Sequence, residues 1–291
     1  MKPPPFDYLR PASLDEALAL LATTENAKLL AGGQSLMAML NLRFVFPDTL
    51  IDLNRIPQLS ELLLIDGRVE IGAMVRQRLL ERSPLIARHL PVMVEALKYV
   101  GHRQTRNRGT IGGSICHLDP SAELPTIALL YDAEVEIASS SGRKRLPIRD
   151  FLAGYMSVKL ASDEMLTRLW IKPWALDHSW AFLEHARRRG DFAIASACCL
   201  VERDNAARIS RVAIAIGGLT DTPIRLDSAE ALLLGTDGGA DLIARASALV
   251  KDMPASADIH ADVDYRRHVA SVLVTRALLQ AMHGATSEAA I

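Results

Sequence analysis

Two short segments rich in glycine are the residues of this sequence best suited to bind phosphate. The first glycine segment reads A-G-G-Q-S over residues 31–35. Glycines let consecutive backbone N–H groups approach an anion, and the positive N-terminal end of a following helix would strengthen the attraction. A Gly-Gly pair after a strand can equally form only a tight turn. This segment alone therefore leaves both interpretations open.

The second glycine segment reads T-I-G-G-S over residues 110–114, is expected to form a second loop, and supplies another glycine pair with two hydroxyl groups. Two such segments could bind the two phosphates of one dinucleotide pyrophosphate from opposite sides. The usual fingerprints of nucleotide binding are absent, since no G-x-G-x-x-G follows a strand and no G-x-x-x-x-G-K-[ST] occurs. The pair therefore favours dinucleotide binding outside a Rossmann fold or a P-loop.

No other constellation predicts catalysis or metal binding by side chains. H-E-x-x-H and G-x-S-x-G are both missing, which argues against metalloprotease and hydrolase classes. His117 follows the second glycine segment and could approach a ligand or simply be solvated. Arg103, Arg106 and Arg108 could offset phosphate charge, bind a partner subunit or form a solvated face.

Composition narrows the class of partner and compartment. The formal net charge of -1 gives no field that would attract nucleic acid or an anionic membrane. The only cysteines are Cys116, Cys198 and Cys199, which excludes a disulfide scaffold and a complete iron–sulfur ligand set. With no signal-peptide pattern and no apolar run long enough to span a bilayer, we expect no membrane span and a cytoplasmic location.

The elements that must position these residues are mixed α and β in the first half. A capping box from Ser13 to Glu16 predicts a helix beginning there. A strand over residues 27–31 and a helix over 36–42 flank the first glycine segment. Further strands are expected at 50–53, 61–65, 68–73, 133–138 and 165–171, and further helices at 91–100 and 123–130.

Prolines and polar residues over 172–178 predict a connection between domains. Beyond it we expect an α+β domain with strands at 180–186, 193–202 and 208–217, followed by helices at 228–234, 242–251 and 265–282. The predicted domains are residues 1–176, with subdomains of about 1–55 and 56–176, and residues 177–291.

Four motifs, in order along nearly the whole chain, carry a family resemblance. They are A-G-G-Q-S-L over 31–36 with Arg43 beyond it, R-N-R-G-T-I-G-G-S over 106–114, D-P-S-A-E over 119–123 and R-R-R-G-D-F-A over 187–193. Together they resemble the FAD-binding medium subunit of the xanthine dehydrogenase and carbon monoxide dehydrogenase family of molybdenum hydroxylases. A narrower resemblance is to enzymes that hydroxylate N-heteroaromatic rings, such as quinoline oxidoreductase and nicotine dehydrogenase.

The resemblance implies an α+β fold of the PCMH/VAO type, in which FAD lies between two subdomains. It also implies a C-terminal domain of the CO-dehydrogenase flavoprotein type, built as a three-stranded antiparallel sheet with helices. Gln34 stands where some relatives have histidine, so the flavin is expected to be non-covalent. No metal site and no catalytic side chain is expected on this chain.

The resemblance also assigns residues to the cofactor. The first glycine segment and its neighbours would line the adenine and pyrophosphate path, the second would contact the same pyrophosphate, and Glu123 would lie near the ribose. Asp191 and Phe192 would approach the isoalloxazine, although Phe192 could equally be an ordinary core residue. The full set is Lys28, Leu29, Leu30, Ala31, Gly32, Gly33, Gln34, Ser35, Leu36, Gly101, Thr110, Ile111, Gly112, Gly113, Ser114, Glu123, Leu160, Arg187, Asp191 and Phe192.

The activity implied is electron transfer within an oxidoreductase complex. A large molybdopterin subunit would hydroxylate the substrate, and a small subunit would pass electrons from its 2Fe-2S clusters through FAD to an external acceptor. A dimer of heterotrimers is the expected assembly. The alternatives are a stand-alone PCMH-fold flavin oxidoreductase with its own substrate pocket, or a non-enzymatic module whose glycines form turns or hold another phosphate ligand.

Overall fold

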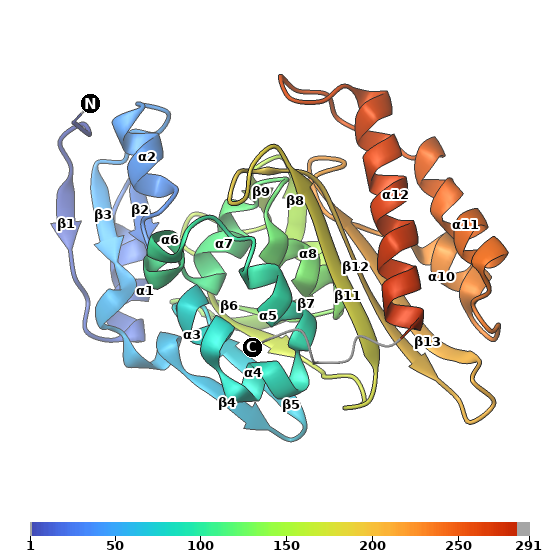
Figure 1. Cartoon of the computed structure of the whole chain (residues 1–291). Coiled ribbons are helices and arrows are strands. Elements are labelled where there is room, and N and C mark those ends of the chain that lie inside the picture. The colour runs from blue at the N-terminus through green and yellow to red at the C-terminus, as the bar shows by residue number, and fades with distance from the viewer. Residues whose placement is uncertain (1, 284–291) are drawn as a thin grey trace. The chain divides into compact units, whose positions relative to one another are not determined.

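The computed structural model describes residues 2–283 and divides into two compact units (Figure 1). Unit 1 comprises Met1–Ser83, His102–Leu118 and Asp132–Lys172, and unit 2 comprises Pro84–Gly101, Asp119–Tyr131 and Pro173–Ile291. The chain therefore contributes two segments of its first half, 84–101 and 119–131, to the same unit as its C-terminal part.

Unit 1 begins with a small parallel sheet that leads into the first glycine segment. Its strands are β1 (Asp7–Leu9), β2 (Ala27–Leu30) and β3 (Thr49–Asp52), in the order β1-β3-β2, with helices α1 (Leu14–Thr23) and α2 (Leu36–Asn41). The predicted capping box is present, because the Ser13 side chain accepts from the Glu16 N–H. Its reciprocal bond differs, since the Glu16 carboxylate accepts from the N–H of Ala12, one residue earlier than expected.

A five-stranded antiparallel sheet is the second sheet of unit 1. Its order is β4 (Leu62–Ile65), β5 (Arg68–Gly72), β10 (Met165–Ile171), β6 (Glu134–Ser139) and β7 (Gly142–Pro147), beside a short pair, β8 (Leu152–Gly154) and β9 (Ser157–Val158). The strands predicted at 61–65, 68–73, 133–138 and 165–171 are thus confirmed. The short helices are α3 (Gln77–Arg82), α6 (Arg103–Arg108), α7 (Ile111–His117), α9 (Ile148–Phe151), η1 (Leu53–Arg55) and η2 (Pro57–Ser60).

Unit 2 is built on a second antiparallel sheet. Its order is β11 (Ser179–Ala186), β12 (Ala193–Arg203), β13 (Ile209–Gly217) and the two-residue β14 (Ile224–Arg225), so the three predicted strands are confirmed and a short fourth is added. The helices of the unit are α4 (Pro84–His89), α5 (Pro91–Leu97), α8 (Glu123–Leu130), α10 (Asp227–Leu233), α11 (Ala240–Ala248), η3 (Leu249–Asp252) and α12 (Val263–Met282).

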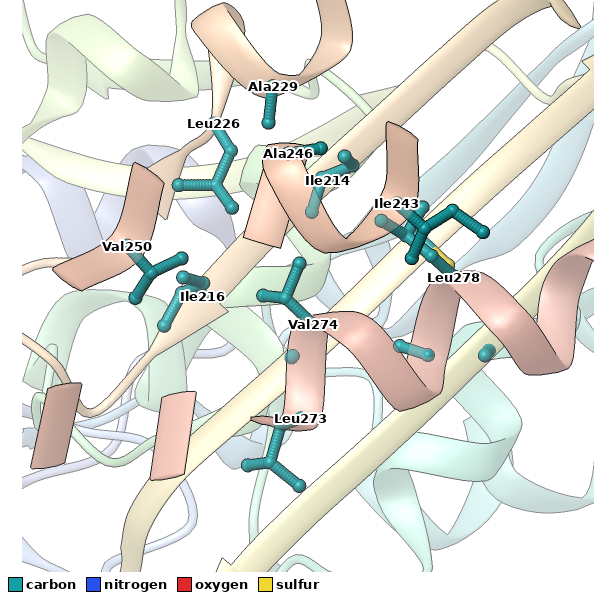
Figure 2. Close-up of a cluster of buried hydrophobic side chains, with 14 of the residues drawn as sticks. Ile214, Ile216, Leu226, Ala229, Ile243, Ala246, Val250, Leu273, Val274 and Leu278 are labelled. Atoms are coloured by element: carbon teal, nitrogen blue, oxygen red, sulfur yellow. The ribbon is translucent and has the colours of Figure 1, made fainter. Parts of the chain in front are cut away.

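Helices cover both faces of this sheet. Successive side chains of each strand point to opposite faces, and apolar side chains lie on both of them. Side chains at odd positions of β12, such as Ala197 and Cys199, belong to one buried hydrophobic cluster with α12. Figure 2 shows Val274 and Leu278 of α12 in this cluster, close to Ile214 and Ile243. On the other face, Phe182 of β11 contacts the ring of Tyr99 with centroids 5.3 Å apart. The predicted α+β class is confirmed. None of the described helices is long and apolar enough to cross a membrane.

Candidate cofactor site

The first glycine segment is a connection with unpaired donors. It follows β2 and precedes α2 as predicted, and Gly33 has φ of +71°, a left-handed conformation that favours glycine. Within residues 2–283, no acceptor is found for the backbone N–H groups of Gly32, Gly33, Gln34 and Ser35. These donors are available to an anionic ligand.

The second glycine segment is not a loop, and that prediction is wrong. Thr110 is the N-cap of α7, and its side-chain oxygen accepts from the Gly113 N–H at 3.1 Å, so the glycine pair lies in the first helical turn. Gly112 is required there because a Cβ atom would lie 2.6 Å from the Ala73 Cβ and 2.7 Å from the Ala73 carbonyl oxygen. The glycines therefore allow close packing of α7 on the chain after β5.

The backbone donors of this second segment are largely used by the protein itself. The N–H of Ile111 donates to the Val75 carbonyl at 3.1 Å, and that of Gly112 to the Ala73 carbonyl at 2.8 Å. The N–H of Ser114 donates to the Thr110 carbonyl. A ligand at this segment would thus meet side chains such as the Ser114 hydroxyl more readily than these backbone donors.

The two segments lie against each other within unit 1. A Cβ atom at Gly32 would lie 2.9 Å from the Arg108 carbonyl carbon and from the Gly109 Cα, and closer still to the Arg108 carbonyl oxygen. A Cβ at Gly113 would lie 3.6 Å from the Ala31 Cβ. The two segments are therefore neighbours, which joint binding of one ligand would require.

The arginines of α6 have different environments. Arg106 is buried and binds both carboxylate oxygens of Glu81, at 3.0 and 3.1 Å, so it holds α6 to α3. Arg103 and Arg108 are exposed. The three arginines therefore do not form one cationic cluster. Arg106 has a structural role that none of the three sequence-based alternatives anticipated.

Sequence reasoning missed a polar network beneath the first glycine segment. The Asn54 side-chain amide donates to the Ala31 carbonyl at 3.0 Å and to the Asp52 carboxylate, which also accepts from the Tyr8 hydroxyl. Arg76 donates to the side-chain oxygen of Asn54. The D-L-N run after β3 could have signalled an Asx turn, because the Asn54 N–H donates to Asp52 at 2.9 Å.

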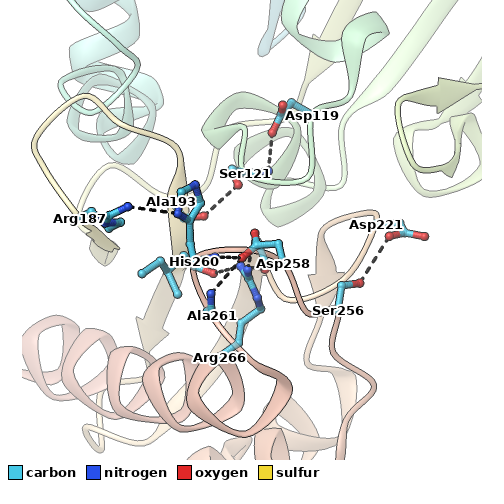
Figure 3. A network of polar contacts seen from close by, with 12 residues as sticks. Asp119, Ser121, Arg187, Ala193, Asp221, Ser256, Asp258, His260, Ala261 and Arg266 are labelled. Atoms are coloured by element: carbon cyan, nitrogen blue, oxygen red, sulfur yellow. Dashed lines mark hydrogen bonds and ion pairs between the residues drawn. The ribbon is translucent and has the colours of Figure 1, made fainter.

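Other candidate residues lie in unit 2, on two connected segments. Glu123 begins α8, and Ser121 just before it donates its hydroxyl to the Ala193 carbonyl at 2.8 Å (Figure 3). That bond ties the 119–123 motif to the start of β12, next to Asp191 and Phe192. Phe192 is 72% exposed, so it is not core. The connection thus holds one end of the β11–β12 turn.

The same turn is also tied to the segment before α12. An Arg187 guanidinium nitrogen lies 3.4 Å from the His260 Nδ1 (Figure 3). Gly190 has φ of +85°, which the sharp turn requires. Two further candidates lie elsewhere: Gly101, with φ of +42°, ends the 84–101 segment of unit 2, and Leu160 follows β9 in unit 1.

Glu184 of β11 is a partly buried acid whose ionisation makes the stability of the fold depend on pH. Its Oε2 has no hydrogen-bond partner among the described residues, and burial raises the pKa of its carboxyl from the usual 4.5 to about 7. The folded state therefore keeps a proton that the unfolded chain loses between these values. As pH rises from about 4.5 to about 7, the free energy of unfolding should fall, by roughly 3 kcal/mol at most.

Glu184→Gln should remove this dependence, because the amide stays neutral. The expected result is a flatter stability profile over that pH window and a more stable protein at pH 8, measured by urea unfolding of the full chain. Glu202→Gln on the neighbouring β12 is the control, since its carboxylate already accepts the Ala175 N–H at 3.0 Å. If the free energy of unfolding of Glu184→Gln still falls with pH as steeply as that of wild type, Glu184 is not the cause of the pH dependence.

Two family models match the chain in succession. The FAD-binding domain in molybdopterin dehydrogenase matches residues 4–174, and the CO dehydrogenase flavoprotein C-terminal domain matches residues 180–281. Among curated relatives, the 6-hydroxypseudooxynicotine dehydrogenase complex subunit alpha of Paenarthrobacter nicotinovorans is 37% identical over 98% of this chain and 97% of its own. The nicotine 6-hydroxylase medium subunit of the same organism is 36% identical over 97% and 99%.

Solved structures agree with the family models. A chain of quinoline 2-oxidoreductase from Pseudomonas putida 86 superposes with a TM-score of 0.93 at 34% identity, covering 97% of this chain and 99% of that one. A chain of carbon monoxide dehydrogenase from Hydrogenophaga pseudoflava gives 0.94 at 35% identity, with the same coverage.

These matches and the fold define a flavoprotein subunit of an oxidoreductase. The chain belongs to the family of FAD-binding medium subunits of molybdenum hydroxylases. Its cofactor is FAD, and its relatives are named as medium subunits or medium chains of larger dehydrogenases and hydroxylases. Family membership favours this function over a stand-alone flavoenzyme or a non-enzymatic module.

Proposed function

We propose that the two glycine segments of unit 1 bind the pyrophosphate of FAD. The observation that carries the proposal is the contact between them, at which the N–H groups of Gly32, Gly33, Gln34 and Ser35 have no acceptor within the described chain. Consecutive backbone N–H groups without an acceptor can donate to the oxygens of a diphosphate, and here they lie where Gly32 packs against the backbone of Arg108 and Gly109. Residues 28–30 and Leu36 then flank the bound dinucleotide.

The two segments contribute differently. The first segment supplies backbone donors, whereas the second supplies its shape and the Ser114 hydroxyl, because its own N–H groups bond within the protein. Glu123, Gly101 and Leu160 belong to the proposed cofactor path by the family resemblance alone. The flavin is non-covalent in this proposal, since Gln34 offers no nucleophilic ring nitrogen.

The bound flavin supplies redox chemistry that links one-electron to two-electron transfer. In the proposed route, electrons from 2Fe-2S clusters of the small subunit reach an external acceptor through this chain. The chain's own residues bind and orient the cofactor and control access to it. No side chain here is assigned a proton-transfer step, and the substrate site lies on the large subunit.

The proposed assembly is a dimer of heterotrimers in the cytoplasm. Three free cysteines, of which Cys198 and Cys199 are buried, fit a reducing compartment. Native mass spectrometry of the complex purified from its host should give a mass equal to two copies of each of three different chains. A single heterotrimer, or this chain in a complex without a molybdenum subunit, would contradict that assembly.

Phe192 should affect the flavin without affecting the fold. Because its ring is 72% exposed, Phe192→Ala should change the free energy of unfolding by about 0.5 kcal/mol or less. In the purified complex the same variant should shift the flavin absorbance bands and the rate of flavin reoxidation. Phe46→Ala, at a ring 58% exposed in unit 1, is the matched control and should change neither. A Phe192→Ala spectrum identical to wild type would remove Phe192 from the site.

A further inference from the structure

Arg76 is the residue that joins the two glycine segments of unit 1. It lies just before α3 and forms an isolated antiparallel bridge with Thr110. One terminal nitrogen of its guanidinium donates to the carbonyl of Arg108, and the other donates to the side chain of Asn54. The two terminal nitrogens of the planar guanidinium thus donate hydrogen bonds to two different parts of the chain.

The link continues through Asn54 to the first glycine segment. The Asn54 amide nitrogen donates to the Ala31 carbonyl at 3.0 Å. The Arg108 carbonyl, at the other end of the link, is the group that a Cβ atom at Gly32 would strike. The Asn54–Arg76 pair therefore fixes the same contact that brings the two segments together.

The charge of Arg76 has no carboxylate partner within the residues that the structure describes. Two other arginines of unit 1, the buried Arg106 and the partly buried Arg168, are paired with Glu81 and Glu70. Asp52, the acid of this network, accepts hydrogen bonds from Tyr8 and Asn54 and forms no ion pair with Arg76. Burial, followed by the like charge of Arg108, lowers the pKa of the Arg76 guanidinium, and the more distant charge of Asp52 opposes this only in part. A cation held in this way is stabilised by an anion placed beside it.

We propose that Arg76, held by Asn54, is a further positioning residue for FAD that sets the spacing of the two glycine segments and offsets the charge of the pyrophosphate. This inference rests on the proposed function, because it assumes that the two segments bind FAD. It adds two residues, Arg76 and Asn54, that belong to neither glycine motif.

The test is a titration of the full-length apo chain with FAD, in which flavin fluorescence reports binding. The titration is done at about 20 mM salt and again at about 500 mM salt, and exposed charges are strongly screened at the higher concentration. Arg76→Met should weaken FAD binding at least tenfold at low salt and by a smaller factor at high salt. Arg76→Lys keeps the charge but loses the fork, so it should bind with intermediate affinity and wild-type salt dependence. Asn54→Ala should weaken binding with the salt dependence unchanged.

Arg68→Met is the matched control, since Arg68 is an exposed arginine of unit 1 paired with Glu134 at 2.9 Å. It should bind FAD as wild type does. Inorganic pyrophosphate should compete with FAD on wild type and less effectively on Arg76→Met. Apo melting temperatures establish that each variant is folded, and if Arg76→Met does not fold, Arg76→Lys and Asn54→Ala decide the question.

Each outcome separates the two proposals. If wild type binds FAD and the Arg76 and Asn54 variants bind within twofold of it, the positioning role is overturned while the proposed function stands. If Arg76→Met loses the same factor at both salt concentrations, the charge-offset role is overturned. If the folded wild-type chain binds no FAD, the proposed function itself fails.

Discussion

Replacing Gly32 with alanine should weaken FAD binding by roughly 5- to 150-fold, the factor that corresponds to about 1–3 kcal/mol of overpacking. The added Cβ would lie 2.9 Å from the Gly109 Cα and closer to the Arg108 carbonyl oxygen, distances that side-chain atoms do not adopt without displacement. Because both neighbours are backbone, the clash cannot be relieved by rotating a side chain. The two glycine segments must move apart, and the free N–H groups of the first segment move with them.

The measurement is the dissociation constant of FAD from the full-length chain. Gly239→Ala is the control, since its Cβ would meet only the Asp237 carboxylate, at an ordinary 3.5 Å. It should leave FAD affinity unchanged. A Gly32→Ala variant that is folded and binds FAD as tightly as wild type would contradict the placement of the pyrophosphate at this contact.

Arg266→Met should destabilise unit 2 by about 2–6 kcal/mol. Arg266 of α12 is 4% exposed and donates to the carbonyls of Ile194 and Gly218, the latter at 2.8 Å. Both acceptors are buried, and leaving a buried carbonyl unpaired costs about 1–3 kcal/mol. The Asp258 carboxylate, 2.7 Å from Arg266, is half-exposed and can be hydrated, so it adds little.

Urea unfolding of the full chain measures this effect. Arg276→Met is the control, because Arg276 is an exposed arginine of the same helix. It should stay within about 0.5 kcal/mol of wild type. An Arg266→Met variant as stable as Arg276→Met would mean that the two carbonyls find other partners. The turn that carries Phe192 should also loosen in Arg266→Met, since Ile194 lies two residues after Phe192.

Local patterns predicted most of the elements that carry the site. The strand, glycine segment and helix around Gly32 are encoded within about fifteen residues, by an apolar run, a glycine pair and a second apolar run. The bounds of α8 and β10 agree with their predicted ranges for the same reason, since hydrophobic periodicity is a local signal.

The second glycine segment shows where local reasoning fails. Adjacent glycines disfavour a helix by about 1 kcal/mol each, so a loop was the natural prediction. Thr110 supplies an N-cap, and the absence of a side chain at Gly112 allows the helix to pack closely against Ala73. Ala73 lies far away in sequence, and nothing local to the segment signals that contact.

The polar network around Arg76 depends on contacts between distant parts of the chain. Asn54, Arg76 and Arg108 are separated by more than twenty residues at each step, and neither Asn54 nor Arg76 belongs to one of the four motifs. The division into units is equally non-local, because α5 and α8 pack on strands that come much later in the chain. A single sequence shows the amphipathic faces but not which partner each face covers.

The most direct test of the central claim is the cofactor content of this chain purified under native conditions. The protein should be yellow, with a flavin absorbance spectrum, and denaturation should release about one FAD per chain with no flavin left attached to the polypeptide. A folded chain that is colourless, releases no flavin and takes up none when FAD is added would contradict its role as an FAD-binding medium subunit.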